Sequence, residues 1–175
     1  IAYLDDDARA TPEWVNSIYK IVCTDDPPQV IGGPIHPFYL TDKPAWFQDK
    51  YEIRTFGDEP RQLKYGEFFS ASNIVFSKDI LEQYNGFDTN TGPKGDTFLL
   101  GEETFLQNRM WKGSESSNDF FYSPDLKVYH LVPPEKMTIK YIINRRFMVG
   151  QSLYYYKFGK IGLLKRILLI IASIG

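Results

Sequence analysis

The chain has 175 residues, of which 43% are hydrophobic and 16% aromatic, so it can bury the core of one folded domain and is not expected to be disordered. A formal net charge of −2 provides no general basic field, which argues against electrostatically driven binding of nucleic acid. The single cysteine, Cys23, excludes an intramolecular disulfide and a multi-cysteine metal site, and we expect it to pack on an apolar helix face.

The first elements are predicted to be a strand, an acidic turn and a helix. Residues 1–4 are typical of a buried strand, and because the sequence starts with Ile rather than Met we expect a segment before it. Three carboxylates follow at residues 5–7. Thr11 and Pro12 suit a helix N-cap and first helical position. The apolar residues of this helix recur at helical spacing: Trp14, Val15, Ile18, Ile21 and Val22.

The middle of the chain predicts two strands separated by a long loop. Residues 30–34 indicate a short strand closed by a glycine pair. Between residues 40 and 65, charged, aromatic and proline residues mix without a period, which favours a surface loop of the kind that often carries function. Residues 68–76 return to strand composition. Ser77 then suits the N-cap of a short helix that ends at Gly86.

The next helix is expected to start near Gly101 and to end at Gly113. Its first turn contains two glutamates, which is favourable because they meet the positive end of the helix dipole. Its inward-facing residues are predicted to be Phe105, Leu106 and Met110. Residues 120–131 again predict strand structure around a Ser-Pro-Asp turn.

The last part of the chain predicts a long helix followed by an apolar tail. Thr138 suits the N-cap of a helix that continues to the tyrosines at 154–156. Residues 161–174 are aliphatic except for one Lys-Arg pair, which makes them too short and too charged for a membrane span of roughly 20 residues. An interfacial helix and the start of a longer apolar segment both fit this tail.

Asp5, Asp6 and Asp7 form the strongest local signal because they directly follow an apolar strand. Ligands bind at strand ends in open α/β sheets, and carboxylates crowded there repel one another unless a cation is present. Mg²⁺ or Mn²⁺ takes oxygen ligands and commonly bridges carboxylates to substrate phosphates, so the pattern fits a nucleoside diphosphate. Taken alone, the triplet also fits a solvated loop or favourable charge before a helix.

Glu102 and Glu103 form a second acidic site at the start of a predicted helix. A carboxylate within hydrogen-bond reach of a bound hydroxyl can accept its proton while the oxygen attacks. The alternative is a favourable interaction with the helix dipole alone. A metal site and a base together would provide the two functions that a group-transfer enzyme needs.

An ordered set of motifs resembles family 2 glycosyltransferases of the GT-A fold. The matching segments are residues 4–7, 11–14, 32–34, 72–76, 84–88 and 101–105, with Arg109. The resemblance extends to about residue 151 and covers the second half of that family's catalytic domain. It implies an α/β fold with a Rossmann-like mixed sheet flanked by helices, without the N-terminal nucleotide-binding half. We expect two parts: a catalytic part, 1–137, and a C-terminal helical segment, 138–175, whose apolar tail associates with a membrane.

The same resemblance implies an inverting, metal-dependent transfer of a sugar to a hydroxyl group in polysaccharide or glycan assembly. The expected donor is a nucleotide sugar, most typically a UDP-sugar, the acceptor a glycan or a lipid-linked molecule, and the cofactor Mg²⁺ or Mn²⁺. Asp7 would bind the metal, Asp5 would face the ribose and the metal's water shell, and Asp6 would belong to the same donor site. The motif's second acid assigns the base to Glu103, but this chain has Glu where Asp is usual, which leaves Glu102 as an alternative.

A histidine and a pair of arginines are further candidates. His130 stands where related enzymes often have a histidine near the metal, although a lone histidine is also a common structural hydrogen-bonding residue. Arg145 and Arg146 could bind the leaving diphosphate because guanidinium matches phosphate geometry, or they could form a basic face toward solvent or a membrane. A Gln-X-X-Arg-Trp motif is absent from the sequence, which argues against synthesis of a long polymer by this chain alone.

Trp46 and Asn73 are candidates for acceptor binding. Sugars stack their C–H faces on aromatic rings, although a surface loop also needs aromatic anchors of its own. Asn73 follows strand-like residues and could contact a sugar.

Two other functions fit parts of the pattern. A non-catalytic module of the same fold would bind a nucleotide sugar or a partner without turnover. A metal-dependent phosphoryl enzyme has little support, because the sequence contains no P-loop. Lysines and arginine between 157 and 166, beside aliphatic residues, suggest a peripheral position on the cytoplasmic face of a plasma membrane, in a bacterial cell.

Overall fold

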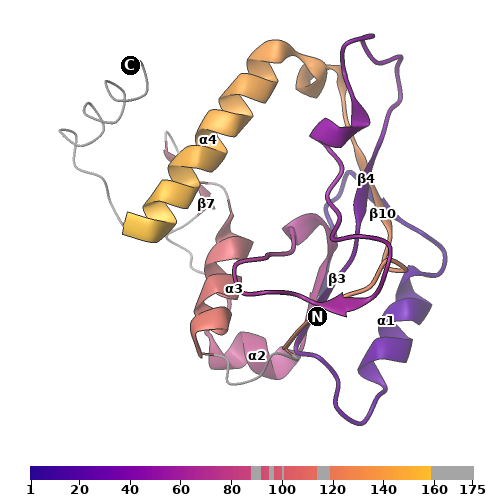
Figure 1. The fold of residues 1–175 in the computed structure, drawn as a ribbon, viewed down its shortest axis with the longest axis vertical. Helices are drawn as coiled ribbons and strands as arrows, with labels where there is room; N and C mark the ends of the chain where they lie inside the picture. Colours follow the sequence, from indigo (N-terminus) through magenta and orange to yellow (C-terminus); the bar gives the residue numbers. More distant parts are fainter. Residues whose placement is uncertain (88–91, 95–96, 100, 114–118, 159–175) are drawn as a thin grey trace.

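A computed structural model of the protein describes residues 1–87, 92–94, 97–99, 101–113 and 119–158 (Figure 1). Its strands are β1 (Ala2–Tyr3), β2 (Ala8–Ala10), β3 (Val30–Gly32), β4 (Ile35–Phe38), β5 (Arg61–Gln62), β6 (Ile74–Phe76), β7 (Gly92–Lys94), β8 (Thr97–Leu99), β9 (Phe120–Tyr122) and β10 (Val128–Leu131). Its helices are α1 (Trp14–Val22), α2 (Lys78–Gln83), α3 (Glu102–Gly113), α4 (Ile139–Phe158) and the 3₁₀ turns η1 (Asp49–Tyr51), η2 (Ala71–Asn73) and η4 (Pro134–Met137). The tail at 161–174, for which an interfacial helix was one prediction, lies outside the described residues.

The strands form a five-stranded sheet in the order β1-β6-β3-β9-β5, a three-stranded sheet in the order β2-β10-β4 and a two-stranded β7-β8 pair. In the large sheet β3 runs parallel to β9, whereas the other neighbours are antiparallel. In the three-stranded sheet β10 runs parallel to β4 and antiparallel to β2. The prediction of an α/β fold with a mixed sheet and flanking helices is confirmed, and this arrangement is compatible with a Rossmann-like fold.

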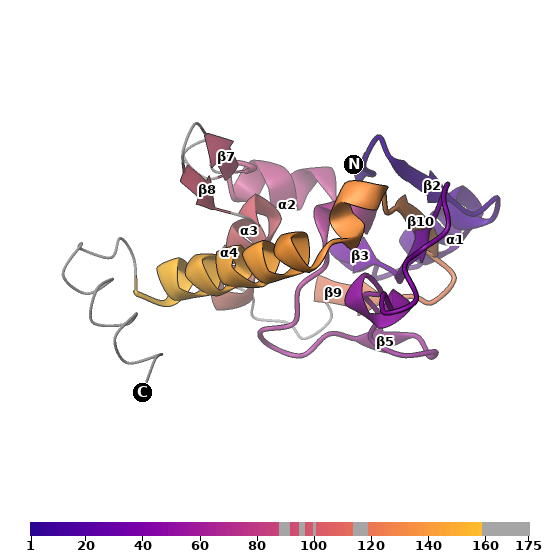
Figure 2. The same ribbon diagram turned by 90° about the horizontal axis from the view of Figure 1, so that it is seen from above.

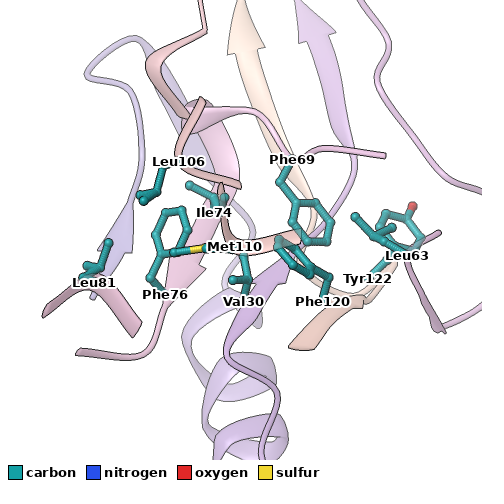
Figure 3. Packing of buried hydrophobic residues seen from close by; sticks show 10 residues of the cluster. All are labelled: Val30, Leu63, Phe69, Ile74, Phe76, Leu81, Leu106, Met110, Phe120 and Tyr122. Atoms are coloured by element: carbon teal, nitrogen blue, oxygen red, sulfur yellow. The ribbon is translucent and has the colours of Figure 1, made fainter. Parts of the chain in front are cut away.

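Helices cover both faces of the large sheet because its central strands are apolar on both sides. Successive residues of a strand point to opposite faces. Val30 accordingly packs toward α2 and α3, while its neighbour Ile31 packs toward α1. Figure 1 shows α1 on one side of β3 and α2 with α3 on the other. The cluster beside α2 and α3, shown in Figure 3, comprises Val30, Leu63, Phe69, Ile74, Phe76, Leu81, Leu106, Met110, Phe120 and Tyr122.

Gly32 and Gly33 end β3 as predicted, and close packing explains both. A Cβ atom on Gly32 would lie 2.3 Å from the ring of Phe69. A Cβ atom on Gly33 would lie 2.2 Å from the carbonyl oxygen of Leu126. Because real Cβ atoms do not approach other atoms so closely, this strand end requires residues without a side chain.

Three predictions about α1 are wrong in detail. The helix begins at Trp14 rather than Pro12, and residue 13 occupies the N-cap position without a side-chain cap. Trp14, Ile18 and Ile21 pack against the sheet, but Val15 and Val22 are 69% and 40% exposed. Cys23 is exposed as well, because it follows the last turn of the helix, beyond its contact with the sheet.

Two strands also differ from the prediction: the first strand is more exposed to solvent, and the strand that ends at residue 76 is shorter. β1 pairs only with β6 in the described part of the chain, and Ile1 is 58% exposed. The strand expected over 68–76 is confined to Ile74–Phe76 because the preceding Ala71–Asn73 forms a 3₁₀ turn.

The helix boundaries predicted from caps are confirmed at three places. Ser77 accepts a hydrogen bond from the amide of Ile80 at the start of α2. α3 spans Glu102–Gly113 and buries Leu106 and Met110. The Thr138 hydroxyl accepts a hydrogen bond from the amide of Tyr141 at the start of α4.

Helix α4 extends away from the sheets (Figure 2). Among the described residues, none of the helices is both long enough and apolar enough to cross a membrane.

Candidate active site

A cleft of about 860 Å³ lies where the ends of β1 and β10, the first turn of α3, the loop after η1 and helix α4 approach one another. The polar residues that line it include Asp5, Glu52, Arg54, Ser70, Ser72, Glu102, Glu103, His130, Lys136, Arg145 and Arg146. Most of the residues predicted as functional therefore share one cleft, although they come from distant parts of the sequence.

Asp5, Asp7 and His130 form a compact cluster of potential metal ligands. Each offers one ligand atom, and these atoms all lie within 4.8 Å of one another. The Nε2 atom of His130 is 3.1 Å from Oδ2 of Asp5 and 3.1 Å from Oδ1 of Asp7. The expectation that these three residues act together is thus geometrically possible.

The donor set of this cluster fits a divalent cation. The Nδ1 atom of His130 lies 3.1 Å from the carbonyl oxygen of Leu131, so a neutral ring that donates there presents its Nε2 lone pair to both carboxylates. Three electron-rich atoms this close repel one another unless a proton or a cation lies between them. Two carboxylate oxygens and one imidazole suit Mn²⁺, and the carboxylates also suit Mg²⁺.

Strand pairing explains why the cluster forms. β2 and β10 are antiparallel, with His130 opposite Ala8, the residue that follows Asp7. The amide of Leu131 donates to the carbonyl oxygen of Asp7 at 3.0 Å, which extends this pairing by one residue. The turn between β1 and β2 is closed by a hydrogen bond of 3.0 Å from the amide of Ala8 to the carbonyl oxygen of Asp5. The acidic turn is therefore held at the end of β10.

Asp6 does not join this cluster. Its side chain is exposed, and it is absent from both the ligand cluster and the lining of the cleft. Lys136 lies beside the cluster, with its Nζ atom 3.6 Å from Oδ2 of Asp7.

Glu103 differs from its neighbour Glu102 in its environment. Burial raises the pKa of Glu103 above its ordinary value of 4.5, and the nearby Glu102 carboxylate adds to the rise. The backbone amides of Glu103 and Ala71 and the charge of Arg54 act in the opposite direction. A carboxylate with a raised pKa is a stronger proton acceptor once it is ionised, so this environment favours Glu103 as the base.

Residues 70–73, just before β6, connect the two acidic sites, and we call them the 70–73 segment. The hydroxyl of Ser72 donates to Asp5, and the hydroxyl of Ser70 accepts from Arg54. The backbone amide of Ala71 lies close enough to Glu103 to lower the pKa of that carboxyl. One short segment therefore lies beside both a potential metal ligand and the candidate base.

Gln107 fastens helix α3 to the residue before this segment. Its side chain is fully buried, accepts a hydrogen bond of 2.8 Å from the amide of Phe69 and donates one of 2.8 Å to the carbonyl oxygen of Phe69. It also donates to the carbonyl oxygen of Glu103 at 3.1 Å. This side chain thus sets the position of the first turn of α3 relative to the 70–73 segment.

The two residues expected to bind acceptor do not line the cleft. Asn73 is 1% exposed; its oxygen accepts from the Trp14 indole at 3.0 Å, and its nitrogen donates to the carbonyl oxygens of Leu126 and Pro34 at 2.6 and 3.3 Å. Its amide is therefore committed to the core. Trp46 is 41% exposed and packs beside the ring of Phe47, with 5.6 Å between ring centroids.

Arg145 and Arg146 both line the cleft, and Arg145 is held there by an ion pair. Arg145 donates to both carboxylate oxygens of Glu52, at 2.6 and 2.7 Å, and this ion pair ties α4 to the long loop. Arg146 is exposed.

Sequence reasoning missed Arg54, Glu52, Lys136, Gln107 and the roles of Ser70, Ala71 and Ser72. Ser72 was part of a recognised motif, but its partner depends on which strands pair. Arg54 and Glu52 lie in a loop without periodicity, where no sequence rule identifies the residues that face a cleft. Gln107 stands within a helix, where a polar residue is normally expected on the solvent side.

Comparison with known proteins gives two relatives and no matching family model. The chain is 26% identical over 160 residues to a protein of Haloferax volcanii named glucosyl-dolichyl phosphate glucuronosyltransferase, covering 87% of this chain and 49% of the relative. It is 23% identical over 164 residues to a protein of Rhizobium meliloti named succinoglycan biosynthesis protein ExoM, covering 87% of this chain and 46% of the relative. The chain thus spans about half the length of the curated relatives that it matches.

Proposed function

We propose that this chain is the second half of the catalytic domain of an inverting, metal-dependent glycosyltransferase of the GT-A type, in the manner of family 2. The donor is a nucleotide-diphosphate sugar, and the acceptor is the hydroxyl group of a glycan or a lipid-linked molecule. The names of the two relatives, which concern a glucuronosyltransferase and succinoglycan biosynthesis, support transfer of a sugar during glycan assembly.

The observation that carries the proposal is the link between the two acidic sites. Ser72 donates a hydrogen bond to Asp5, a member of the potential metal cluster, and the adjacent Ala71 lies close enough to Glu103 for its backbone amide to act on the pKa of that carboxyl. Asp5 and Glu103 both line the cleft, so a single substrate could contact both. A base beside an anion-binding metal site is the arrangement that transfer from a diphosphate donor requires.

In the proposed reaction, Glu103 accepts the proton of the acceptor hydroxyl while that oxygen forms a bond to the anomeric carbon of the donor. The bond from this carbon to the diphosphate breaks on the opposite side, so the configuration inverts and the diphosphate leaves with the electron pair. Positioned base catalysis of this kind contributes about 10²- to 10⁴-fold. Glu102 contributes a negative charge that keeps the pKa of Glu103 high.

Asp5, Asp7 and His130 would hold Mn²⁺ or Mg²⁺, which supplies positive charge to the departing diphosphate. Ser72 orients Asp5 for this role, and the Leu131 carbonyl fixes the His130 ring. Lys136 balances the charge of Asp7.

The test compares Asp7→Asn with Asp6→Asn in the complete protein that contains this chain. Mn²⁺ affinity is measured by calorimetry, and transfer is assayed with a panel of UDP-sugars and of glycan and prenyl-phosphate-linked acceptors. Asp7→Asn should abolish Mn²⁺ binding and transfer, whereas Asp6→Asn should leave Mn²⁺ affinity within about twofold, because Asp6 is exposed and outside the cluster.

Three results would count against the proposal. Equal loss of Mn²⁺ binding in both variants would contradict the assigned cluster. Full transfer by the Asp7 variant would contradict the metal's role. Binding of a UDP-sugar by the wild type without any turnover would favour a non-catalytic module of the same fold.

We further propose that α4 rests on the cytoplasmic surface of an anionic membrane, in keeping with a lipid-linked acceptor. Ile139, Ile143 and Phe147 recur at four-residue spacing, so they lie on one face of the helix, and each is 62% exposed. Lys140 and Arg146 are exposed beside this stripe, and further lysines follow in the sequence. An apolar stripe flanked by basic residues is typical of a helix that lies in a membrane interface.

Liposome sedimentation tests this membrane surface. Vesicles containing anionic lipid should sediment the wild type, and Ile143→Ser with Phe147→Ser should reduce the bound fraction several-fold. Val15→Ser provides a control at an exposed apolar residue on α1. An undiminished bound fraction in the double variant would exclude this face as the attachment surface.

A further inference from the structure

Arg54 is a cleft residue whose backbone is fixed although it lies in the long loop. Its amide and carbonyl groups both pair with Ile35, at 3.0 and 2.9 Å, in an isolated antiparallel bridge. Ile35 begins β4 and stands opposite Val128 on β10, two residues before His130. The three-stranded sheet that places His130 therefore also places Arg54.

The guanidinium group of Arg54 has unused hydrogen-bond donors. It donates to the hydroxyl of Ser70, and within the described parts of the chain it forms no ion pair with any carboxylate. A guanidinium has five N–H donors in a fixed plane, so a bond to one neutral hydroxyl leaves most of them available. The nearby Glu52 is already paired with Arg145.

Arg54 is also linked to the potential metal cluster. Ser70 and Ser72 have their hydroxyl oxygens 3.5 Å apart, and Ser72 donates to Asp5. Asp5 and Glu103 are both near enough to act on the charge of Arg54, while burial and the charge of Arg145 lower its pKa. Arg54 thus lies in the same part of the cleft as the two acidic sites.

Basic side chains balance the acids in and beside the cleft. The bases that line it are Lys50, Arg54, Lys136, Arg145 and Arg146, and the acids are Asp5, Glu52, Glu102 and Glu103. Asp7 adds a fifth acid beside Lys136. A planar guanidinium without a carboxylate partner among the described residues matches the geometry of phosphate oxygens, so Arg54 is suited to an anionic ligand.

We propose that Arg54 directly binds a phosphate group of a substrate inside this cleft. The ligand's chemistry rests on the proposed function, which offers two sources: the diphosphate of the donor and the phosphate of a lipid-linked acceptor. In either case Arg54 holds a phosphate near the base and the metal cluster, where the acidic side chains alone would repel it.

The test measures phosphate binding without metal or turnover. With EDTA present, calorimetry or NMR titration compares UDP, inorganic pyrophosphate and geranyl phosphate on the wild type, Arg54→Gln, Arg54→Lys and Lys78→Gln. Arg54→Gln should weaken at least one probe about tenfold, and Arg54→Lys should weaken it less, because lysine keeps the charge but loses the planar fork. Lys78→Gln removes one positive charge on α2, outside the cleft lining, and should change no affinity.

The probe whose affinity falls identifies which substrate phosphate Arg54 binds. Weaker binding of UDP and pyrophosphate assigns Arg54 to the donor diphosphate, and weaker binding of geranyl phosphate assigns it to the acceptor; both support the proposal. Unchanged affinity for all three probes in a folded Arg54→Gln protein overturns it.

A variant of the partner residue separates binding from a structural role. Ser70→Ala removes the hydroxyl that Arg54 contacts and should weaken phosphate binding less than Arg54→Gln does, whereas equal weakening by the two variants would show that Arg54 acts only by holding the 70–73 segment. This binding experiment does not depend on turnover, so its result is separate from that of the transfer assay. A chain that binds phosphate through Arg54 but transfers no sugar in that assay would contradict the proposed function and still support this inference.

Discussion

The hydroxyl of Ser72 donates a hydrogen bond to the carboxylate of Asp5, although 67 positions separate the two residues. The pairing of β1 with β6 explains this contact. The strands are antiparallel with Tyr3 opposite Ile74, so the residues that follow β1 lie beside the 3₁₀ turn that precedes β6. A potential metal ligand is thus oriented by the turn that leads into the neighbouring strand.

Ser72→Ala should weaken Mn²⁺ binding about tenfold while the fold remains intact. A hydrogen bond to a charged group contributes about 1.5–3 kcal/mol, and part of this is lost when Asp5 can turn freely. Calorimetry with Mn²⁺ measures the affinity, and thermal unfolding checks the fold. Thr24→Ala is the control, since the exposed Thr24 hydroxyl donates to the carbonyl oxygen of Ile21, outside the cleft lining; equal weakening in both variants would contradict the specific role of Ser72.

Glu103→Gln should reduce the rate of transfer about 10²- to 10⁴-fold, and Glu102→Gln should reduce it much less. In the wild type the rate should rise with pH as Glu103 loses its proton, at a pH above the ordinary value of 4.5 because burial raises its pKa. Rates measured against pH test this assignment. A larger loss in the Glu102 variant would move the base to that residue.

The ionisation of Glu103 should lower the stability of the fold as pH rises, whereas it raises the rate of transfer. The folded-state pKa of Glu103 lies above its unfolded value, so its contribution to the free energy of unfolding is greatest below pH 4.5 and declines as pH rises through the folded pKa. The glutamine side chain in Glu103→Gln cannot ionise, so the stability of the variant does not decline in this way. Urea unfolding at several pH values should therefore show the variant gaining stability relative to the wild type as pH rises, and a constant difference would contradict the raised pKa.

Gln107→Leu should impair transfer without removing any group that contacts substrate. The variant leaves the buried amide and carbonyl of Phe69 without their partners, which costs about 2–4 kcal/mol, and it frees the first turn of α3 from the 70–73 segment. Urea unfolding measures the stability, and transfer rates report the position of Glu103. Gln107→Glu keeps an acceptor for the Phe69 amide but loses the donor to the Phe69 carbonyl. Its transfer rate should therefore lie between the rates of the wild type and of Gln107→Leu. A fully active Gln107→Leu enzyme would contradict the positioning role.

Asn73→Ala should destabilise the fold by about 3 kcal/mol, because it leaves the Trp14 indole and a carbonyl oxygen buried without partners and creates a cavity. The substitution should have little effect on acceptor affinity in the fraction of the variant that is folded. Urea unfolding and a measurement of KM for the acceptor separate the two roles. A raised KM with unchanged stability would restore the acceptor contact predicted from the sequence.

The sequence by itself predicted the local elements that depend on neighbouring residues. The cap at Ser77 and the start of α3 at Glu102 follow from helix capping and the helix dipole, and the glycine pair that ends β3 is a recognisable turn signal. The acidic turn after β1 and the acids of α3 were recognisable for the same reason, because each is a short pattern at the end of an element.

Only the tertiary structure decided which of these residues meet. His130 joins Asp5 and Asp7 because β10 pairs with β2, and Asn73 belongs to the core because its amide reaches Trp14 and Leu126. Arg54 faces the cleft through a single bridge to Ile35. Strand register and loop placement depend on contacts between residues that are distant in the sequence, so no local pattern encodes them.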